Sequence, residues 1–288
     1  MAAEPSARMP AAFLGHGSPR NALDANRYTR AWREFGRAVP TPRAILAISA
    51  HWFINATAVT AMPSPRTIHD FFGFEQQLFD VQYPAPGLPE LAEEIADVVH
   101  PTWVGADVDS WGIDHGTWSV LTHAFPAADV PVVQLSLNAY QDFDYHLELG
   151  AKLAPLRERG VLVVASGNIV HNLARMDRRL PDEGFDWAHR FDAAARVMIM
   201  DRPDGVASLD GHADFEHAVP TTDHFLPLLY LAGLASVGDD LVEPLVDGFA
   251  YGSLSMSAYT LGVTCTAGED GPPSAGFPDT PNPSDTNT

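Results

Sequence analysis

The stretch "GVLVVASGNIVH", residues 160–171, decides the fold. Its first seven residues form a continuous apolar, β-branched run, and a polar turn that ends in a histidine comes directly after it. Continuous short runs of this kind are typical of parallel strands that are covered on both faces. The stretch therefore predicts a buried strand with an imidazole, His171, just beyond its carboxyl end.

Comparable apolar runs recur along the chain and predict further buried strands at 11–15 ("AAFLG"), 44–50 ("AILAISA") and 130–137 ("VPVVQLSL"). The segment 252–262 alternates Ser with apolar residues and predicts a late, half-exposed strand. Segments with helical periodicity separate these strands, at 21–38, 88–99, 116–124, 145–158, 187–200 and 224–235. This alternation predicts an α/β fold: a single-domain sandwich whose central mixed, largely parallel sheet is flanked by helices.

The domain limits follow from composition. The chain has 288 residues, of which 46% are hydrophobic, enough for one substantial core. Residues 1–8 carry no apolar pattern, and residues 266–288 are acidic and rich in Pro, Gly and Ser, so we expect a disordered tail at each end. The folded part is predicted at 9–265, with no linker inside it.

Charge and composition exclude several classes of partner. With 17 basic and 37 acidic residues the formal charge is −20, which would repel the phosphates of a nucleic acid. No window approaches the roughly 18 uninterrupted apolar residues of a membrane span, and no signal segment is evident, so we expect a cytoplasmic protein without a membrane partner. A monomer and a homodimer are both compatible with the sequence. The single cysteine excludes a Cys-based zinc site, which leaves His, Asp and Glu as metal ligands.

The histidines fall into a pattern. His16, His51 and His171 each come after an apolar run, so three predicted strands deliver an imidazole near their carboxyl ends. That edge of an open α/β sheet is where ligands bind. Two more histidines, His224 and His115, stand at predicted loop-to-helix junctions. Because imidazole suits both Zn and Fe(II), the sequence predicts a His-rich mononuclear metal centre.

An aromatic segment, "IHDFFGFEQQLFDVQYPAPG" (68–87), carries five aromatic residues between Pro and Gly boundaries. It is either a long loop packed on the core or a wall against a flat apolar substrate, in which case His69 and Asp70 are its polar handles. Other catalytic motifs are weak: "GHGS" does not match the nucleophile elbow of hydrolases, and the lysine of a phosphate-binding loop is absent.

Eight motifs carry a family resemblance: "FLGHGSP", "SAHWF", "IHDFFGFEQQLFDVQYPAPG", "WGIDHGTWSVL", "VPVVQLSLN", "VASGNIVHNL", "PTTDHFLPLLY" and "YGSLSMSAY". In this order, over about residues 9–262, they closely resemble the DOPA 4,5-dioxygenase-like proteins. These are a branch of the class III extradiol ring-cleaving dioxygenases, related to protocatechuate 4,5-dioxygenase.

The resemblance implies the roles of the histidines. His16 and His51 match two metal ligands, and His224 falls where related enzymes supply the third. His115 and His171 match two acid/base histidines, although in some members the residue at His171 is counted as a fourth ligand. The wider superfamily has a glutamate as its third ligand. The neutral His224 leaves the centre one unit more positive, which favours an anionic catecholate but also suits zinc.

The resemblance also implies a reaction. Fe(II) is expected for activity, Zn(II) is the metal in some isolated members, and the substrates are a small aromatic diol and O2. The expected function is thus an extradiol dioxygenase that inserts O2 into a catechol, DOPA or a related diol, and opens the ring. The alternative on the same fold is a zinc-dependent hydrolase or a non-enzymatic metal-binding protein.

Overall fold

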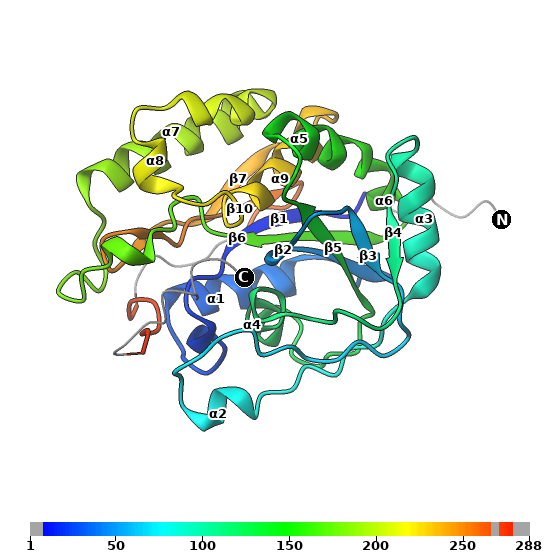
Figure 1. Ribbon diagram of the computed structural model, residues 1–288, viewed down its shortest axis with the longest axis horizontal. Helices are drawn as coiled ribbons and strands as arrows, with labels where there is room; N and C mark the ends of the chain where they lie inside the picture. Colours follow the sequence, from blue (N-terminus) through cyan, green and yellow to red (C-terminus); the bar gives the residue numbers. More distant parts are fainter. Residues whose placement is uncertain (1–7, 266–270, 279–288) are drawn as a thin grey trace.

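A mixed eight-stranded sheet forms the centre of the molecule (Figure 1). The structure is a computed structural model that describes residues 8–265 and 271–278. The strand order is β4-β3-β5-β2-β6-β1-β10-β7, and β8 pairs with β9 in a separate small sheet. The strands are β1 Ala11–Gly15, β2 Ala44–Ile54, β3 Ala58–Thr60, β4 Gly105–Asp107, β5 Val132–Asn138, β6 Val161–Gly167, β7 Val242–Val246, β8 Phe249–Ala250, β9 Leu254–Ser255 and β10 Ala258–Leu261.

Four parallel strands, β5, β2, β6 and β1, occupy the middle of the sheet. Strands β10 and β7 continue it with antiparallel pairing, and β3 is antiparallel to β5 on the other side. The predicted mixed, largely parallel sheet is confirmed. Since Gly15 at the end of β1 pairs with Gly167 at the end of β6, the residues just beyond these strands leave the sheet side by side.

Helices cover both faces of the sheet (Figure 1). Helix α9 packs on β1, β2 and β6 with α5 against it and α7 and α8 beyond, while α4 packs on β2 and β6 from the opposite face with α1 beside it. The helices are α1 Arg27–Ala38, α2 Gln76–Phe79, α3 Pro89–Val99, α4 His115–Ala124, α5 Phe143–Lys152, α6 Ala154–Glu158, α7 Asp186–Asp201, α8 Phe215–Ala218 and α9 Leu226–Ser236, with 3-10 turns η1 Pro19–Ala22, η2 Leu173–Arg175 and η3 Pro203–Gly211.

Two hydrophobic cores lie on the two faces of the sheet. Successive side chains of a strand point to opposite faces, so Phe13 of β1 joins the core beneath α9 and Leu14 joins the core beneath α1 and α4. This alternation explains why the central strands read as continuous apolar runs. Helix α9 is buried from Leu226 to Ala235, and Pro227 lies in its first turn, where a missing N–H costs little.

Several elements differ from the sequence-based expectation. The predicted helix 145–158 is two helices, because the chain turns at Leu153 and Pro155 lies in the first turn of α6. Strand β2 continues to Ile54, so His51 lies within the strand rather than after it. The predicted half-exposed strand 252–262 is instead two short strands, β9 and β10, in different sheets. Its serines are buried, and Ser255 and Ser257 hydrogen-bond to the Asp192 carboxylate, which satisfies their hydroxyls away from water.

The segment 271–278 belongs to the stretch for which we expected a disordered tail, yet it lies against the domain: Ser274 and Ala275 are each 4% exposed. Residues 266–270 and 279–288, like residues 1–7 of the expected N-terminal tail, lie outside the described residues. Across the described part of the chain, no helix is long and apolar enough to cross a membrane.

Candidate active site

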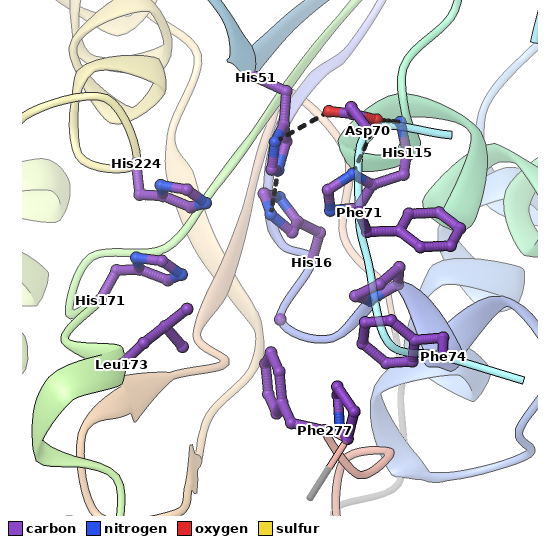
Figure 2. Close-up of a pocket in the computed structure, with 13 residues that line it drawn as sticks. His16, His51, Asp70, Phe71, Phe74, His115, His171, Leu173, His224 and Phe277 are labelled. Atoms are coloured by element: carbon purple, nitrogen blue, oxygen red, sulfur yellow. Dashed lines mark hydrogen bonds and ion pairs between the residues drawn. The ribbon is translucent and has the colours of Figure 1, made fainter. Parts of the chain in front are cut away.

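Five histidines from five separate segments line one cavity at the carboxyl edge of the central strands (Figure 2). The lining residues are His16, Gly17, Pro19, His51, Asp70, Phe71, Phe74, His115, His171, Leu173, His224, Phe277 and Pro278. All five imidazoles are less than 8% exposed. The structure therefore brings together the five histidines that the sequence singled out.

Local structure positions each imidazole. His16 comes directly after β1, and His51 lies where the pairing of β2 with β5 shifts between Ile48 and Phe53. His115 is the first residue of α4, whose N-cap Asp114 accepts a hydrogen bond from the Thr117 amide.

The other two imidazoles come from the opposite side of the cavity, as Figure 2 shows. His171 forms an isolated bridge with Leu254, four residues after the end of β6. His224 lies in the turn before α9. The rings of His171 and His224 are stacked, with centroids 3.5 Å apart and planes 2° from parallel.

Ser166 fixes the tautomer of His16. The Ser166 hydroxyl donates to the Gly116 carbonyl at 2.6 Å, so its oxygen is left to accept from Nδ1 of His16, 3.0 Å away. His16 therefore carries its proton on Nδ1 and presents the lone pair of Nε2 to the cavity.

Asp70 lies behind two of the imidazoles. Its Oδ1 accepts from the His115 amide at 3.1 Å and lies 2.9 Å from the ring Nδ1 of His115, while Oδ2 is 3.1 Å from Nδ1 of His51 in an ion-pair contact. A carboxylate beside Nδ1 favours the proton on that nitrogen. Asp70 thus holds both rings with Nε2 facing away from the carboxylate.

Asp223 plays the same part for His224, since its Oδ2 hydrogen-bonds to Nδ1 of that ring. Four imidazoles are therefore held through Nδ1, three of them by the two carboxylates and the fourth, His16, by the Ser166 hydroxyl. A carboxylate or other acceptor behind Nδ1 is the usual support of a metal-binding histidine, because it orients the ring and raises the basicity of Nε2.

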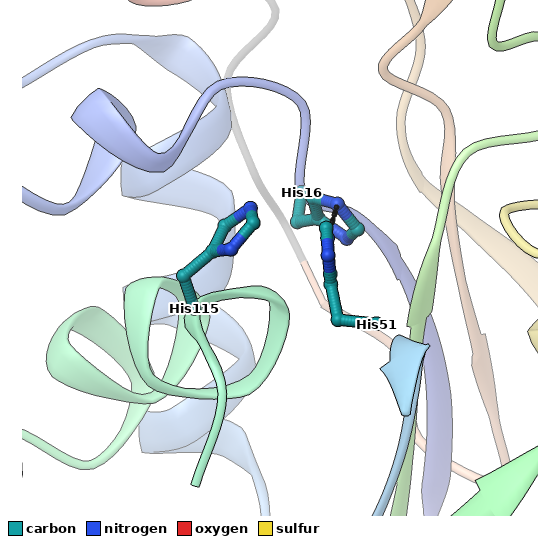
Figure 3. Close-up of side chains that lie close together, drawn as sticks. All are labelled: His16, His51 and His115. Carbon is teal, nitrogen blue, oxygen red and sulfur yellow. Dashed lines mark hydrogen bonds between the residues drawn. The ribbon is translucent and has the colours of Figure 1, made fainter. Parts of the chain in front are cut away.

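The donor set fits a divalent cation. One ligand atom each from His16, His51 and His115 lies within 4.8 Å of the others (Figure 3), and the Nε2 atoms of His16 and His51 are 3.2 Å apart. Two lone pairs at that separation repel unless a proton or a cation lies between them. The buried Oδ1 of Asp223 has no hydrogen-bond donor, and the carboxylates of Asp70 and Asp223 balance the charge of such a cation.

The pKa values of the site histidines shift in two directions. Burial lowers the pKa of His16, His115, His171 and His224. Neighbouring imidazoles lower the pKa of His16 and His171 further, whereas Asp70 opposes the shift at His115 and Asp223 opposes it at His224. Burial alone would lower the pKa of His51 as well, but Asp70 outweighs it and raises the pKa to about 9. Four of the rings are thus neutral and able to accept a proton or bind a metal, while His51 holds a proton in the metal-free protein.

Glycines make the turn after β1. Gly17 has φ +58°, a conformation that favours glycine, and a Cβ there would lie 2.5 Å from the Met256 sulfur. A Cβ on Gly15 would lie 2.8 Å from the Met256 backbone. At both glycines the group that approaches closely is Met256.

The two remaining candidates, Asp70 and His69, differ in their position relative to the cavity. Asp70 lines the cavity as expected, although it contacts histidines rather than standing alone as a polar handle. His69 does not line it: its Nε2 hydrogen-bonds to the Val81 carbonyl, and its ring packs near Trp118. Of the aromatic segment, Phe71 and Phe74 form part of the cavity wall.

Sequence reasoning missed Ser166 and Phe277. Ser166 was visible as the last residue of a predicted strand one residue before a glycine, but its pairing with His16 depends on the alignment of β1 with β6. Phe277 was visible as the single aromatic residue among residues 266–288. It was not selected because the residues around it have the composition of a disordered tail.

Comparison with known proteins gives a consistent picture. Residues 10–262 match the family described as "Catalytic LigB subunit of aromatic ring-opening dioxygenase". The chain is 44% identical over 261 residues to "4,5-DOPA dioxygenase extradiol" of Escherichia coli K12, covering 89% of this chain and 96% of that protein. It is 34% identical to the protein of the same name from Beta vulgaris, over 85% of this chain and 96% of the relative.

A solved structure supports the fold. The crystal structure of an uncharacterized protein from Escherichia coli K12 superposes with a TM-score of 0.78 at 39% sequence identity, covering 88% of this chain and 100% of that one.

Proposed function

The chain belongs to the family of catalytic LigB subunits of aromatic ring-opening dioxygenases, and we propose that it is a metal-dependent extradiol dioxygenase acting on a catechol. The observation that carries the proposal is the cavity itself, in which oriented imidazoles face an apolar wall of Phe71 and Phe74. Such a site offers nitrogen ligands to a metal and a flat apolar surface to an aromatic ring.

For the metal we propose His16, His51 and His224 as ligands, with Fe(II) in the active enzyme. Each has its Nδ1 held by a partner, which leaves Nε2 for the cation. His115 lies within ligand distance of His16 and His51, so it is the competing third ligand. When bound, Fe(II) would supply Lewis acidity toward the diol and the redox chemistry of O2, which Zn(II) lacks.

Proton transfer falls to the histidines that do not bind the metal. His171 has a pKa held well below its usual value by burial and by the neighbouring His224, so it is neutral and accepts a proton from a catechol hydroxyl. His115 is oriented by Asp70, whose negative charge stabilises the imidazolium that forms when Nε2 takes up a proton. Two bases on opposite sides of the cavity suit a diol with two hydroxyl protons.

The function is tested by reconstituting metal-free protein with Fe(II) under anaerobic conditions and then adding a panel of catechols, including DOPA, in air. We expect yellow semialdehyde to form with uptake of one O2 per ring, and the Zn(II)-loaded protein to be inert. If no catechol is turned over by the Fe(II)-loaded protein, the dioxygenase proposal fails.

The ligand assignment is tested by metal stoichiometry. We expect His16→Ala, His51→Ala and His224→Ala to lose the metal, and His115→Ala and His171→Ala to retain it and lose rate. A metal-free His115→Ala protein together with a metal-replete His224→Ala protein would move the third ligand from His224 to His115.

A further inference from the structure

Residues 271–278, here called the C-terminal strap, lie across one end of the histidine cavity. Phe277 and Pro278 line it together with Leu173 and Phe74, and Figure 2 shows the Phe277 ring at the end of the cavity away from His51 and Asp70. The family match covers residues 10–262, so the strap lies outside the matched residues.

The loop after β1 holds the strap by specific hydrogen bonds. The fully buried Asn21 accepts from the Ala275 amide at 2.9 Å and donates to the Ser274 hydroxyl at 3.1 Å. The Ser18 hydroxyl donates to the Gly276 carbonyl at 2.7 Å. The Asn21 amide also donates to the His16 carbonyl at 3.0 Å, so the same side chain fixes both the strap and the loop of His16.

A second set of contacts holds Phe277 from the other side. The Arg178 guanidinium donates to the carbonyls of Phe277, at 3.1 Å, and Pro278. The Tyr251 ring packs edge-on against the Phe277 ring, with centroids 6.0 Å apart. The position of the Phe277 ring is therefore set by groups from three different segments, rather than by the strap alone.

The strap makes this end of the cavity apolar and narrow. Phe71, Phe74, Leu173 and Phe277 form its surface, and the described lining residues include no Lys or Arg and, apart from Asp70 behind the histidines, no carboxylate. The cavity volume is about 40 Å³. An apolar cavity that accommodates benzene is on the order of 150 Å³, so a ring must displace side chains in order to enter.

We propose that the C-terminal strap is a specificity-determining wall, and that Phe277 selects catechols whose ring is unsubstituted or carries a small uncharged substituent. This inference rests on the proposed function and narrows its substrate class. A charged substituent directed at Phe71, Phe74, Leu173 and Phe277 would lose its hydration without gaining a partner, which is costly. A bulky one would have to push Phe277 out of its contacts with Arg178 and Tyr251.

The test compares kcat/KM for catechol, 4-methylcatechol, 4-tert-butylcatechol and DOPA. In the natural protein we expect the first two to be preferred at least tenfold over the last two. Phe277→Ala should raise the ratio of 4-tert-butylcatechol to catechol at least tenfold, and Phe277→Trp should lower it. Phe72→Ala is the matched control, because Phe72 is a neighbouring aromatic that is 59% exposed and does not line the cavity.

A second readout needs neither metal nor turnover. Diethyl pyrocarbonate modifies accessible imidazoles, and mass spectrometry of the metal-free protein resolves the rates at His171 and His224. We expect faster modification in Phe277→Ala and in a chain ended at residue 270, both checked for an unchanged melting temperature, and no change in Phe72→Ala.

The outcomes separate the two proposals. Turnover with an unchanged substrate ratio in Phe277→Ala, or equal use of DOPA and catechol by the natural protein, would overturn the strap inference and leave the dioxygenase in place. Absence of turnover in every variant would overturn the dioxygenase, and with it the substrate preference. Equal modification rates in all variants would then show that the strap does not cover the cavity either.

Discussion

The Nε2 atoms of His16 and His51 lie 3.2 Å apart, while Nδ1 of His16 is bonded to Ser166 and Nδ1 of His51 faces Asp70. Because both Nδ1 atoms carry protons, the lone pairs of the two Nε2 atoms face each other. They therefore share one positively charged species that lies between them. In the metal-free protein that species is a proton, which agrees with the raised pKa of His51, about 9. A metal ion must displace this proton before it binds.

Metal affinity should therefore depend on pH. Below about pH 9 the metal-free His51 holds a proton that binding must release, so the apparent affinity for Zn(II) or Co(II) should fall by about tenfold for each pH unit between 8 and 6. Calorimetric titration in buffers of different ionisation enthalpy should count about one proton released per metal at pH 7. An affinity that is constant across this range would contradict the shared-proton arrangement.

Asp70→Asn should weaken the metal centre without unfolding the protein. The amide retains one acceptor for His115 but loses the charge and the second oxygen that face His51. Loss of a carboxylate behind a ligand histidine typically costs 10- to 100-fold in metal affinity. Competition with a chromophoric chelator measures this. Asp80→Asn, an exposed carboxylate of the same segment, is the control and should leave the affinity unchanged.

Much of the fold and of the histidine set was predictable because both are encoded locally. A strand buried on both faces must be apolar at nearly every position, so "GVLVVAS" was visible as β6 without knowledge of its neighbours. The parallel direction of β1, β2 and β6 then places the residues beyond their carboxyl ends at one edge of the sheet, which is why His16 and His171 were found.

The features that the sequence did not reveal depend on contacts between distant segments. Ser166 supports His16 only because β1 and β6 are in register, and the Phe277 wall exists because Asn21, 253 residues before Ser274, bonds to the strap. The short strands β3 and β4 were not predicted, because three residues carry too little periodicity to be distinguished from a loop. Neither secondary-structure propensity nor amino-acid composition predicts which distant segments come into contact.

Gly17→Ala should destabilise the protein through two separable effects. A left-handed φ costs an alanine about 1–2 kcal/mol, and the new Cβ lies 2.5 Å from the Met256 sulfur. Because Met256 has a flexible side chain, Met256→Ala should relieve the contact but not the backbone cost. In a double-mutant cycle of unfolding free energies, the double variant should therefore be more stable than the sum of the single effects predicts. Strict additivity would contradict the contact.

Asp192→Asn should stabilise the protein above pH 7. Burial raises the pKa of Asp192 to about 6, against the opposing hydrogen bonds of Ser255 and Ser257. The unfolded carboxyl, with a pKa near 3.9, releases its proton first, so between about pH 4 and 6 the folded state binds the extra proton and stability falls as pH rises. The neutral amide avoids that loss, which is on the order of 2–3 kcal/mol once Asp192 is ionised. Urea unfolding should show that Asp192→Asn raises the free energy of unfolding strongly at pH 8 and less at pH 5. The exposed Asp204→Asn is the control and should leave the free energy of unfolding unchanged at both pH values. A gain of equal size at both pH values would mean that Asp192 is not the titrating group.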